Sequence, residues 1–243
     1  MIVTASEEGW RCITQPDHAH LAQDILALWR TDGLPEHPRR SALLRAVLEH
    51  DNGWQEADAA PLLEGSSRPV DFLNFPLNSR FDVWRRGIAR HRESQPYVAA
   101  LILEHARRLH QIQRTAGVET SAAWNRFLDE LDTMSPALLA EAELDATTLE
   151  TDYRWLHLAD LLSLTVCAGW SEPFERYGMR GQLKQKTLEL APFPLAGATR
   201  FSVPCRILPR RVYPTATAMA TALATNRWQS LDLRLAPGAA STA

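Results

Sequence analysis

The chain has 243 residues, of which 45% are apolar and 23% are charged, the ordinary balance of a soluble globular protein. This length fits one large domain, or one domain with a small annex. The formal net charge is −3 and no basic stripe alternates with aromatic residues, so nucleic acid is not an implied partner.

The first third of the chain alternates short strands, helices and one long loop. We expect two short strands in "MIVTASEEGWRCIT", joined by a Glu-Gly turn. A helix follows over "QPDHAHLAQDILALWR", where apolar residues recur on one face. A second helix, "RRSALLRAVLEHD", stops at Asn52-Gly53, a strong turn signal. The segment from about residue 55 to 78 is rich in Pro, Gly and Ser but also contains phenylalanines, which indicates an ordered, packed loop.

Helices dominate the middle of the chain, and its end changes character. The helical segments are "FDVWRRGIARHRES", "QPYVAALILEHARRLHQIQ", "AAWNRFLDELDTM" and "SPALLAEAELDATTLETDYRWLHLADLLSLTVCAGW". After about residue 185, "TLELAPFPL", "TRFSVPCRILP" and "SLDLRLAP" predict short strands, with one small helix in "TATAMATALATNRW". We therefore expect a mostly α fold: a helical domain over residues 1–184 that includes the N-terminal strands, and a small C-terminal α/β appendage over residues 185–243, packed on the same domain.

The sequence also bears on location. The N-terminal segment lacks the basic region and apolar core of a secretory signal. The longest apolar run, "LADLLSLTVCAGW", is shorter than the about 20 residues that cross a bilayer. Cys12, Cys167 and Cys205 form no CxxC pair, which is typical of buried free thiols in a reducing compartment. We expect a cytoplasmic protein with no membrane partner.

Several titratable residues lie where a helix should be apolar. A titratable side chain with apolar neighbours at i±3 and i±4 is expected to be buried, and a buried charge needs a partner because desolvation is costly. By this test His18 lies on the apolar face of its helix, whereas His20 lies on the solvated side. His50 and Asp51 lie at the inward end of the second helix, and His105 shares the apolar face of a later one.

Asp160 is the most constrained of these residues. Its helix, "WLHLADLLSLTVC", is apolar almost all round and offers the carboxylate no Lys or Arg at i±4. Imidazole and carboxylate are the usual ligands of zinc, iron and manganese. One or two divalent ions between the helices of a bundle would explain all the positions together. The predicted ligands are His18, His50, Asp51, His105 and Asp160.

Ordinary structural roles compete with this hypothesis. A single inward histidine is more often a hydrogen-bonded core residue than a metal ligand. His50 could be placed there because a histidine is stabilised at the C-terminus of a helix. Asp51-Asn52-Gly53 is a favourable turn sequence without any metal. Asp160 could pair with an arginine from elsewhere in the fold. These alternatives stay open at the level of the sequence.

The order of these residues resembles that of a known superfamily. His18, His50, Asp51 and Asp160 match in order and approximate spacing the pattern of the HD superfamily of metal-dependent phosphohydrolases, and His105 resembles the additional ligand of binuclear members. HD enzymes usually follow the pair with a Gly-Lys-type turn, whereas "HDNGWQEAD" stands here. Over nearly the whole chain, "ITQPDHAHLAQDI", "AVLEHDNGW", "LADLLSLTVC" and the proline-broken C-terminal strands are similar to DUF3891, a family of uncharacterised bacterial proteins.

The HD resemblance implies an HD-like helical bundle and a metal-dependent hydrolase that acts on a small phosphorylated molecule. It implies that metal-bound water is the nucleophile, with Asp51 as a catalytic residue. Asp58, Arg80 and Arg85 lie on or next to the loop after the His50-Asp51 pair, which makes Asp58 a further candidate catalytic residue and the two arginines candidate substrate contacts. An HD-like di-iron oxygenase would use the same metal ligands for different chemistry. A non-enzymatic binding protein, with a buried polar network in place of the metal, is the third possibility.

Overall fold

The structure is a computed structural model that describes residues 1–115 and 121–238. Its helices are α1 (Gln15–Ala27), α2 (Arg40–Glu49), α3 (Gln55–Ala59), α4 (Leu77–Arg92), α5 (Pro96–Thr115), α6 (Ala122–Glu141), α7 (Ala146–Ala168) and α8 (Ala216–Thr225). Two 3-10 turns are η1 (Asn52–Trp54) and η2 (Phe72–Asn74). The strands are β1 (Ile2–Ala5), β2 (Trp10–Ile13), β3 (Leu63–Glu64), β4 (Arg68–Pro69), β5 (Phe174–Arg176), β6 (Met179–Lys184), β7 (Thr187–Ala191), β8 (Thr199–Leu208) and β9 (Trp228–Pro237).

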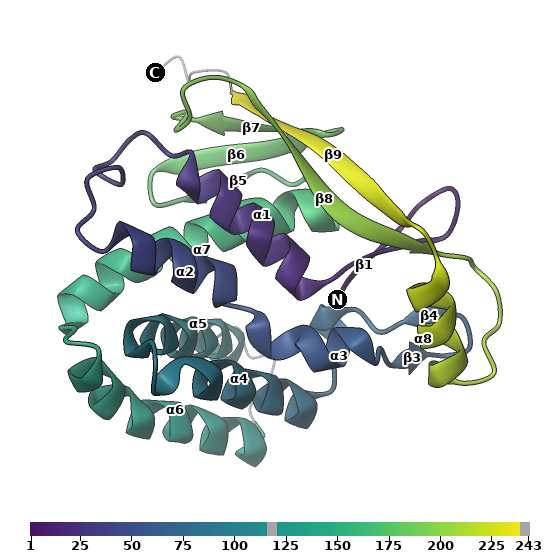
Figure 1. The fold of residues 1–243 in the computed structure, drawn as a ribbon, viewed down its shortest axis with the longest axis horizontal. Coiled ribbons are helices and arrows are strands. Elements are labelled where there is room, and N and C mark those ends of the chain that lie inside the picture. Colours follow the sequence, from purple (N-terminus) through teal and green to yellow (C-terminus); the bar gives the residue numbers. More distant parts are fainter. Residues whose placement is uncertain (116–120, 239–243) are drawn as a thin grey trace.

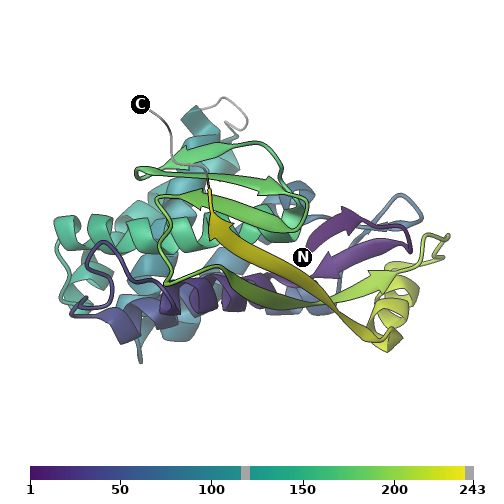
Figure 2. The same cartoon turned by 90° about the horizontal axis from the view of Figure 1, so that it is seen from above.

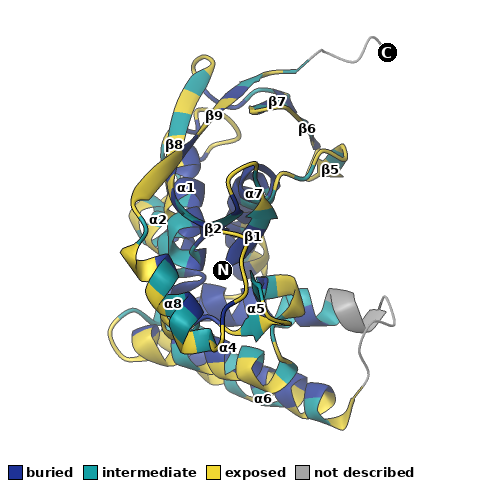
Figure 3. Cartoon of the chain, turned by 90° about the vertical axis from the view of Figure 1, so that its right-hand side faces the viewer, coloured by how far each residue is buried: buried dark blue, intermediate teal, exposed yellow. Residues whose placement is uncertain are grey.

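A large sheet covers one side of a helical layer (Figure 1). Its strand order is β1-β2-β8-β9-β7-β6-β5, and all neighbouring pairs are antiparallel except β7 and β9. The hairpin β1–β2 and the strands β5–β7 lie at opposite ends of the long strands β8 and β9 (Figure 2). Seen from the side, the sheet curls around α1 and α7, and α4, α5 and α6 lie beyond them (Figure 3).

The predicted mostly helical fold class is wrong, because the chain folds as α/β. Strands make up 20% of the described structure and helices 52%, and the sheet has seven strands that form a curled half-barrel. The N-terminal and C-terminal strands belong to this one sheet, since β2 pairs with β8 through Trp10 and Leu208. The C-terminal strands are therefore part of the main architecture and not a small appendage on a helical bundle. The division of the chain at residue 184 stays a prediction.

The sequence analysis missed the hairpin formed by β5 and β6. Its two-residue turn is Tyr177-Gly178, and both residues have positive φ, 52° and 78°. Positive φ at both central residues is the type I′ geometry that suits the twist of a hairpin, and it is usually signalled by Asn-Gly or Asp-Gly. A tyrosine at the first position concealed the turn.

The boundary between α6 and α7 also differs from the expectation. The sequence suggested a break after Met134, but Pro136 lies inside α6 and the helix continues to Glu141. The break lies at Glu143, which has a φ of 52°. Asp145 then caps α7 by accepting a hydrogen bond from the backbone N–H of Thr148, an ordinary N-cap arrangement.

The core lies between the sheet and the helices, and α7 runs through its middle. This helix contacts α1, α2 and α5 as well as β1, so nearly every face of it is buried. The loop after η1 is ordered as expected, since Asp71 accepts a hydrogen bond from the backbone of Val3 in β1. Cys12, Cys167 and Cys205 are buried free thiols, as predicted. Within the described parts of the chain, a search for a helix with the length and apolarity to cross a membrane finds none.

Candidate metal centre

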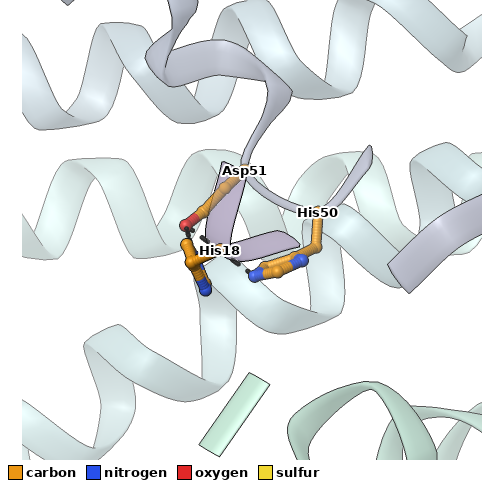
Figure 4. Close-up of side chains that lie close together, drawn as sticks. All are labelled: His18, His50 and Asp51. Carbon is orange, nitrogen blue, oxygen red and sulfur yellow. Dashed lines mark hydrogen bonds and ion pairs between the residues drawn. The ribbon is translucent and has the colours of Figure 1, made fainter. Parts of the chain in front are cut away.

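The five residues predicted as metal ligands come from four helical segments and lie together in the core. His18 is on α1, His50 and Asp51 follow α2, His105 is on α5 and Asp160 is on α7. All five are buried, with exposed fractions of 7% or less. The side chains of His18, His50 and Asp51 point toward one another in Figure 4. The structure thus brings together residues that are remote in sequence.

The distances between their nitrogen and oxygen atoms are those of a group that could hold a metal ion. Nε2 of His18 lies 2.9 Å from Oδ2 of Asp51, and Nε2 of His50 lies 3.7 Å from the same oxygen. Nε2 of His50 also lies 3.3 Å from Oδ1 of Asp160, and Nε2 of His105 lies 3.6 Å from Oδ2 of Asp160. Ligands bonded at about 2.0–2.2 Å to one zinc ion lie about 3–3.6 Å from each other.

Two overlapping triads meet at His50. His18, His50 and Asp51 form one, and His50, His105 and Asp160 form the other, each with ligand atoms within 4.8 Å of one another. The triads share Nε2 of His50, which has a single lone pair to give. The shared nitrogen favours one ion at a time.

The local sequence fixes the turn that carries Asp51. Gly53 packs directly against the backbone of α4, where a Cβ atom on Gly53 would lie 2.0 Å from the carbonyl oxygen of Val83. Arg86 donates a hydrogen bond to the carbonyl oxygen of Gly53 at 3.1 Å, and Arg90 donates one to Oδ1 of Asn52 at 3.2 Å. The Asn-Gly pair that stops α2 therefore also anchors Asp51 at its place in the core.

His50 has an unpartnered nitrogen in the middle of the site. Its Nδ1–H donates to the carbonyl oxygen of Val47 at 2.7 Å, so in the neutral ring Nε2 carries only a lone pair. Nε2 is buried and has no hydrogen-bond partner among the described residues, although it lies 3.3 Å from Oδ1 of Asp160. A lone pair facing the carboxylates of Asp51 and Asp160 is unfavourable unless a proton or a metal ion lies there.

The pKa values of the histidines and carboxylates in this site reflect two opposing effects, burial and the charges of their neighbours. Burial lowers the pKa of His50, but the carboxylates of Asp51 and Asp160 outweigh burial and raise it to about 9. Burial raises the pKa of Asp160, but His50 and His105 outweigh it and hold that pKa well below its usual range. Burial lowers the pKa of His105 to about 4. The site thus favours one positive charge between two carboxylates.

Asp152 shows what a fully satisfied buried carboxylate looks like in the same fold. His37 Nε2 lies 2.8 Å from its Oδ1, Tyr97 donates to Oδ2 at 2.8 Å, and Arg39 approaches Oδ2 at 3.5 Å. Asp160 has no such arginine: among the described residues its ion pairs are with histidines only. The alternative in which Asp160 pairs with an arginine is therefore not realised in the described chain.

Ser163 belongs to the site but was missed by the sequence analysis. Its hydroxyl oxygen lies 3.0 Å from Nδ1 of His18 and donates to the carbonyl oxygen of Asp160 at 2.9 Å. It lies one helical turn after Asp160, so the same periodicity that selected Asp160 could have selected it. A polar partner on the second ring nitrogen is the usual support of a histidine ligand.

Asp58 and Arg85 lie apart from both triads. Asp58 is buried and accepts from the amino group of Met1 at 2.5 Å and from the backbone N–H of Gln15 at 2.6 Å. Arg85 is on the surface, where it pairs with Glu130 at 2.6 Å. The catalytic role of Asp58 and the substrate contact of Arg85 stay predictions.

A cavity of about 170 Å³ opens onto the site. Asp51, His105 and Asp160 form part of its wall, together with the predicted substrate contact Arg80. The other lining residues are Gln15, Trp54, Phe72, Leu73, Trp84, Leu109, His110, Leu164 and Trp170. A molecule in this cavity reaches both the carboxylates of the site and the guanidinium of Arg80.

Comparisons with known proteins place the chain in a family without giving it an activity. No curated protein and no solved structure matches it significantly. The likeness to the HD superfamily therefore rests on the site residues alone. The family model described as "Protein of unknown function (DUF3891)" matches residues 1–210. This match spans most of the chain, which therefore belongs to the DUF3891 family.

Proposed function

We propose that the protein is a metal-dependent hydrolase that acts on a small phosphorylated molecule. His18, His50, Asp51 and Asp160 would hold one divalent ion of iron, manganese or zinc, with His105 beside it. The observation that carries the proposal is the buried Nε2 of His50, which faces two carboxylates and has no hydrogen-bond partner among the described residues. Such an atom fits a cation better than a finished polar network.

A divalent ion supplies Lewis acidity, which lowers the pKa of a water molecule toward neutrality and offsets charge on a phosphoryl oxygen. Groups of the protein itself would orient the histidine ligands and form the cavity. Val47 and Ser163 orient the rings of His50 and His18. The aromatic walls of the cavity limit access of bulk water, and Arg80 places a positive charge on the same cavity.

A second candidate keeps the metal ligands and changes the chemistry. The position of His105, 3.6 Å from Asp160, favours a richer ligand set such as that of a di-iron oxygenase. The sharing of His50 by both triads weighs against two simultaneous ions. A binding protein with a buried polar network would need a proton, in place of a metal ion, on Nε2 of His50.

Elemental analysis of protein purified without chelator tests the metal centre. We expect about one equivalent of iron, manganese or zinc in the wild type. Asp51→Asn and Asp160→Asn should lose it, whereas Asp152→Asn should keep it, because Asp152 is equally buried but bonded to His37 and Tyr97. Phosphoester and oxygen-consumption screens then separate the two enzyme classes. A wild type that stays metal-free after reloading with each ion contradicts both.

A further inference from the structure

Four residues that line the cavity beside the candidate metal centre each carry a buried polar atom that has no partner among the described residues. Oε1 of Gln15, Nε of Arg80, Nε1 of Trp84 and Nε2 of His110 are buried and make no hydrogen bond to any residue in the described ranges. Gln15, Trp84 and His110 are 1%, 4% and 2% exposed. Buried polar atoms are rarely left unpaired, so four of them around one cavity indicate a polar ligand.

His110 is an acceptor of fixed orientation. Its Nδ1–H donates to the carbonyl oxygen of Ala106 at 2.6 Å, which leaves the lone pair of Nε2 to accept a hydrogen bond. The ring packs among Trp124, Phe127 and Phe81, with ring centres 4.7, 5.0 and 5.8 Å away. Burial lowers the pKa of His110 to about 4, so the ring is neutral and requires a donor such as a hydroxyl group.

Arg80 brings a positive charge without a carboxylate to balance it. Its Nη2 donates to the carbonyl oxygens of Leu73 and Phe75 at 3.1 and 3.0 Å, and no ion pair of the described chain includes it. Arg85, five residues along the same helix, is paired with Glu130 and Asp82 instead. A positive charge fixed by neutral carbonyl groups at a cavity wall calls for an anion.

We propose that the cavity recognises a small organic anion that carries a hydroxyl group, with Arg80 on the anionic group and His110 accepting from the hydroxyl. The anion is a carboxylate or a phosphate, and a space of about 170 Å³ suits a small one. The inference rests on the proposed function in one respect: a ligand with a phosphate group would be the substrate of the metal centre, whereas a carboxylate ligand would contradict that function.

Calorimetry with two matched pairs of probes tests the assignment. Glycerol 3-phosphate is compared with propyl phosphate, and glycerate with propionate, on metal-loaded and on chelator-treated protein. In at least one pair we expect the hydroxylated member to bind roughly tenfold more tightly, as one well-made hydrogen bond allows. The pair that shows this preference distinguishes phosphate from carboxylate.

Variants assign the effect to the two residues. His110→Phe keeps an aromatic ring in the aromatic cluster and should abolish the preference for the hydroxylated member. Arg80→Met should weaken both members of the pair at least tenfold. Arg92→Met, at an arginine of the same helix that pairs with Glu141 on the surface, should change neither. Metal content and Tm of each variant check that its fold and metal centre are intact.

The comparison of the probe pairs on the wild-type protein tests the inference even where a variant fails to fold. If neither pair binds, or if binding shows no hydroxyl preference, the inference is overturned; a preference that survives in folded His110→Phe overturns the role of His110. A hydroxyl preference in chelator-treated protein that never takes up metal supports the cavity assignment while the proposed function fails. Bound metal without a preference for the hydroxylated probe supports the proposed function and overturns the cavity assignment.

Discussion

At His50, one ring nitrogen is committed to the backbone of Val47 and the other meets two carboxylates. Without metal, a proton must occupy the second nitrogen, which is why the pKa of His50 rises from its ordinary 6.5 to about 9. A raised pKa contributes stability that is complete below pH 6.5 and is lost as the pH rises through 9. We therefore expect the metal-free protein to lose stability with rising pH, and metal binding in the proposed centre to remove this loss.

We predict that the free energy of unfolding of chelator-treated protein falls by on the order of 3 kcal/mol between pH 6.5 and 9. The metal-loaded protein should show no such fall, since the ion replaces the proton. Urea titrations at several pH values measure the effect. His50→Gln is the control, and an equal fall in that variant would show that another group is responsible.

Ser163 allows a second test at the scale of one residue. Ser163→Ala removes the group 3.0 Å from Nδ1 of His18 and leaves a buried nitrogen without its partner. We expect metal affinity, measured by competition with a chelating dye, to fall about 10-fold or more. Ser202→Ala, at an exposed position on β8, should leave the affinity unchanged. Unchanged affinity in Ser163→Ala would place His18 outside the ligand set.

At the scale of elements, the contact between η1 and α4 holds Asp51 in place. Gly53→Ala would put a methyl group 2.0 Å from the carbonyl oxygen of Val83, so α4 and η1 must separate. We predict a loss of about 2–3 kcal/mol in the free energy of unfolding, together with weaker metal binding. Gly197→Ala, which meets nothing within 4 Å, is the matched control. Equal stability of the two variants in urea would contradict this account.

The same scale shows what the sequence could and could not predict. Helical periodicity is a local signal, and it was enough to select His18, His105 and Asp160 as inward residues. Sheet pairing is not local: the partner of β2 is β8, almost at the other end of the chain. Patterning alone therefore indicated strands at both ends but not the one sheet that they form.

The walls of the cavity were beyond sequence reasoning for a similar reason. Gln15, Trp84 and His110 come from three helices, and nothing in their spacing shows that they line the cavity that Asp51 and Asp160 reach. Helical periodicity places His110 on a partly inward face, but it cannot show which neighbour that face meets. The candidate metal ligands and Arg80 were predicted from the sequence, whereas the places of Gln15, Trp84 and His110 in the cavity wall required the tertiary structure.

At the scale of the whole molecule, the sheet and the helices are tied together too closely to unfold separately. α1 packs on β8, α7 packs on β1, and β7 pairs in parallel with β9. We predict one thermal transition, with far-UV and near-UV circular dichroism coincident. Metal at about 100 times its Kd should raise the Tm of this transition by roughly 5–10 °C. Two transitions would instead identify residues 185–243 as a separately folding unit.

The separation of the ligands along the chain sets an order of events during synthesis. His18 meets Ser163 across 145 residues, so α7 must leave the ribosome before the site exists. In the proposed metal centre a growing chain would therefore have no complete site with which to select an ion. A completed site would take up an ion according to affinity and supply, with zinc ahead of iron and manganese at equal supply, so the metal in a preparation would depend on the expression medium.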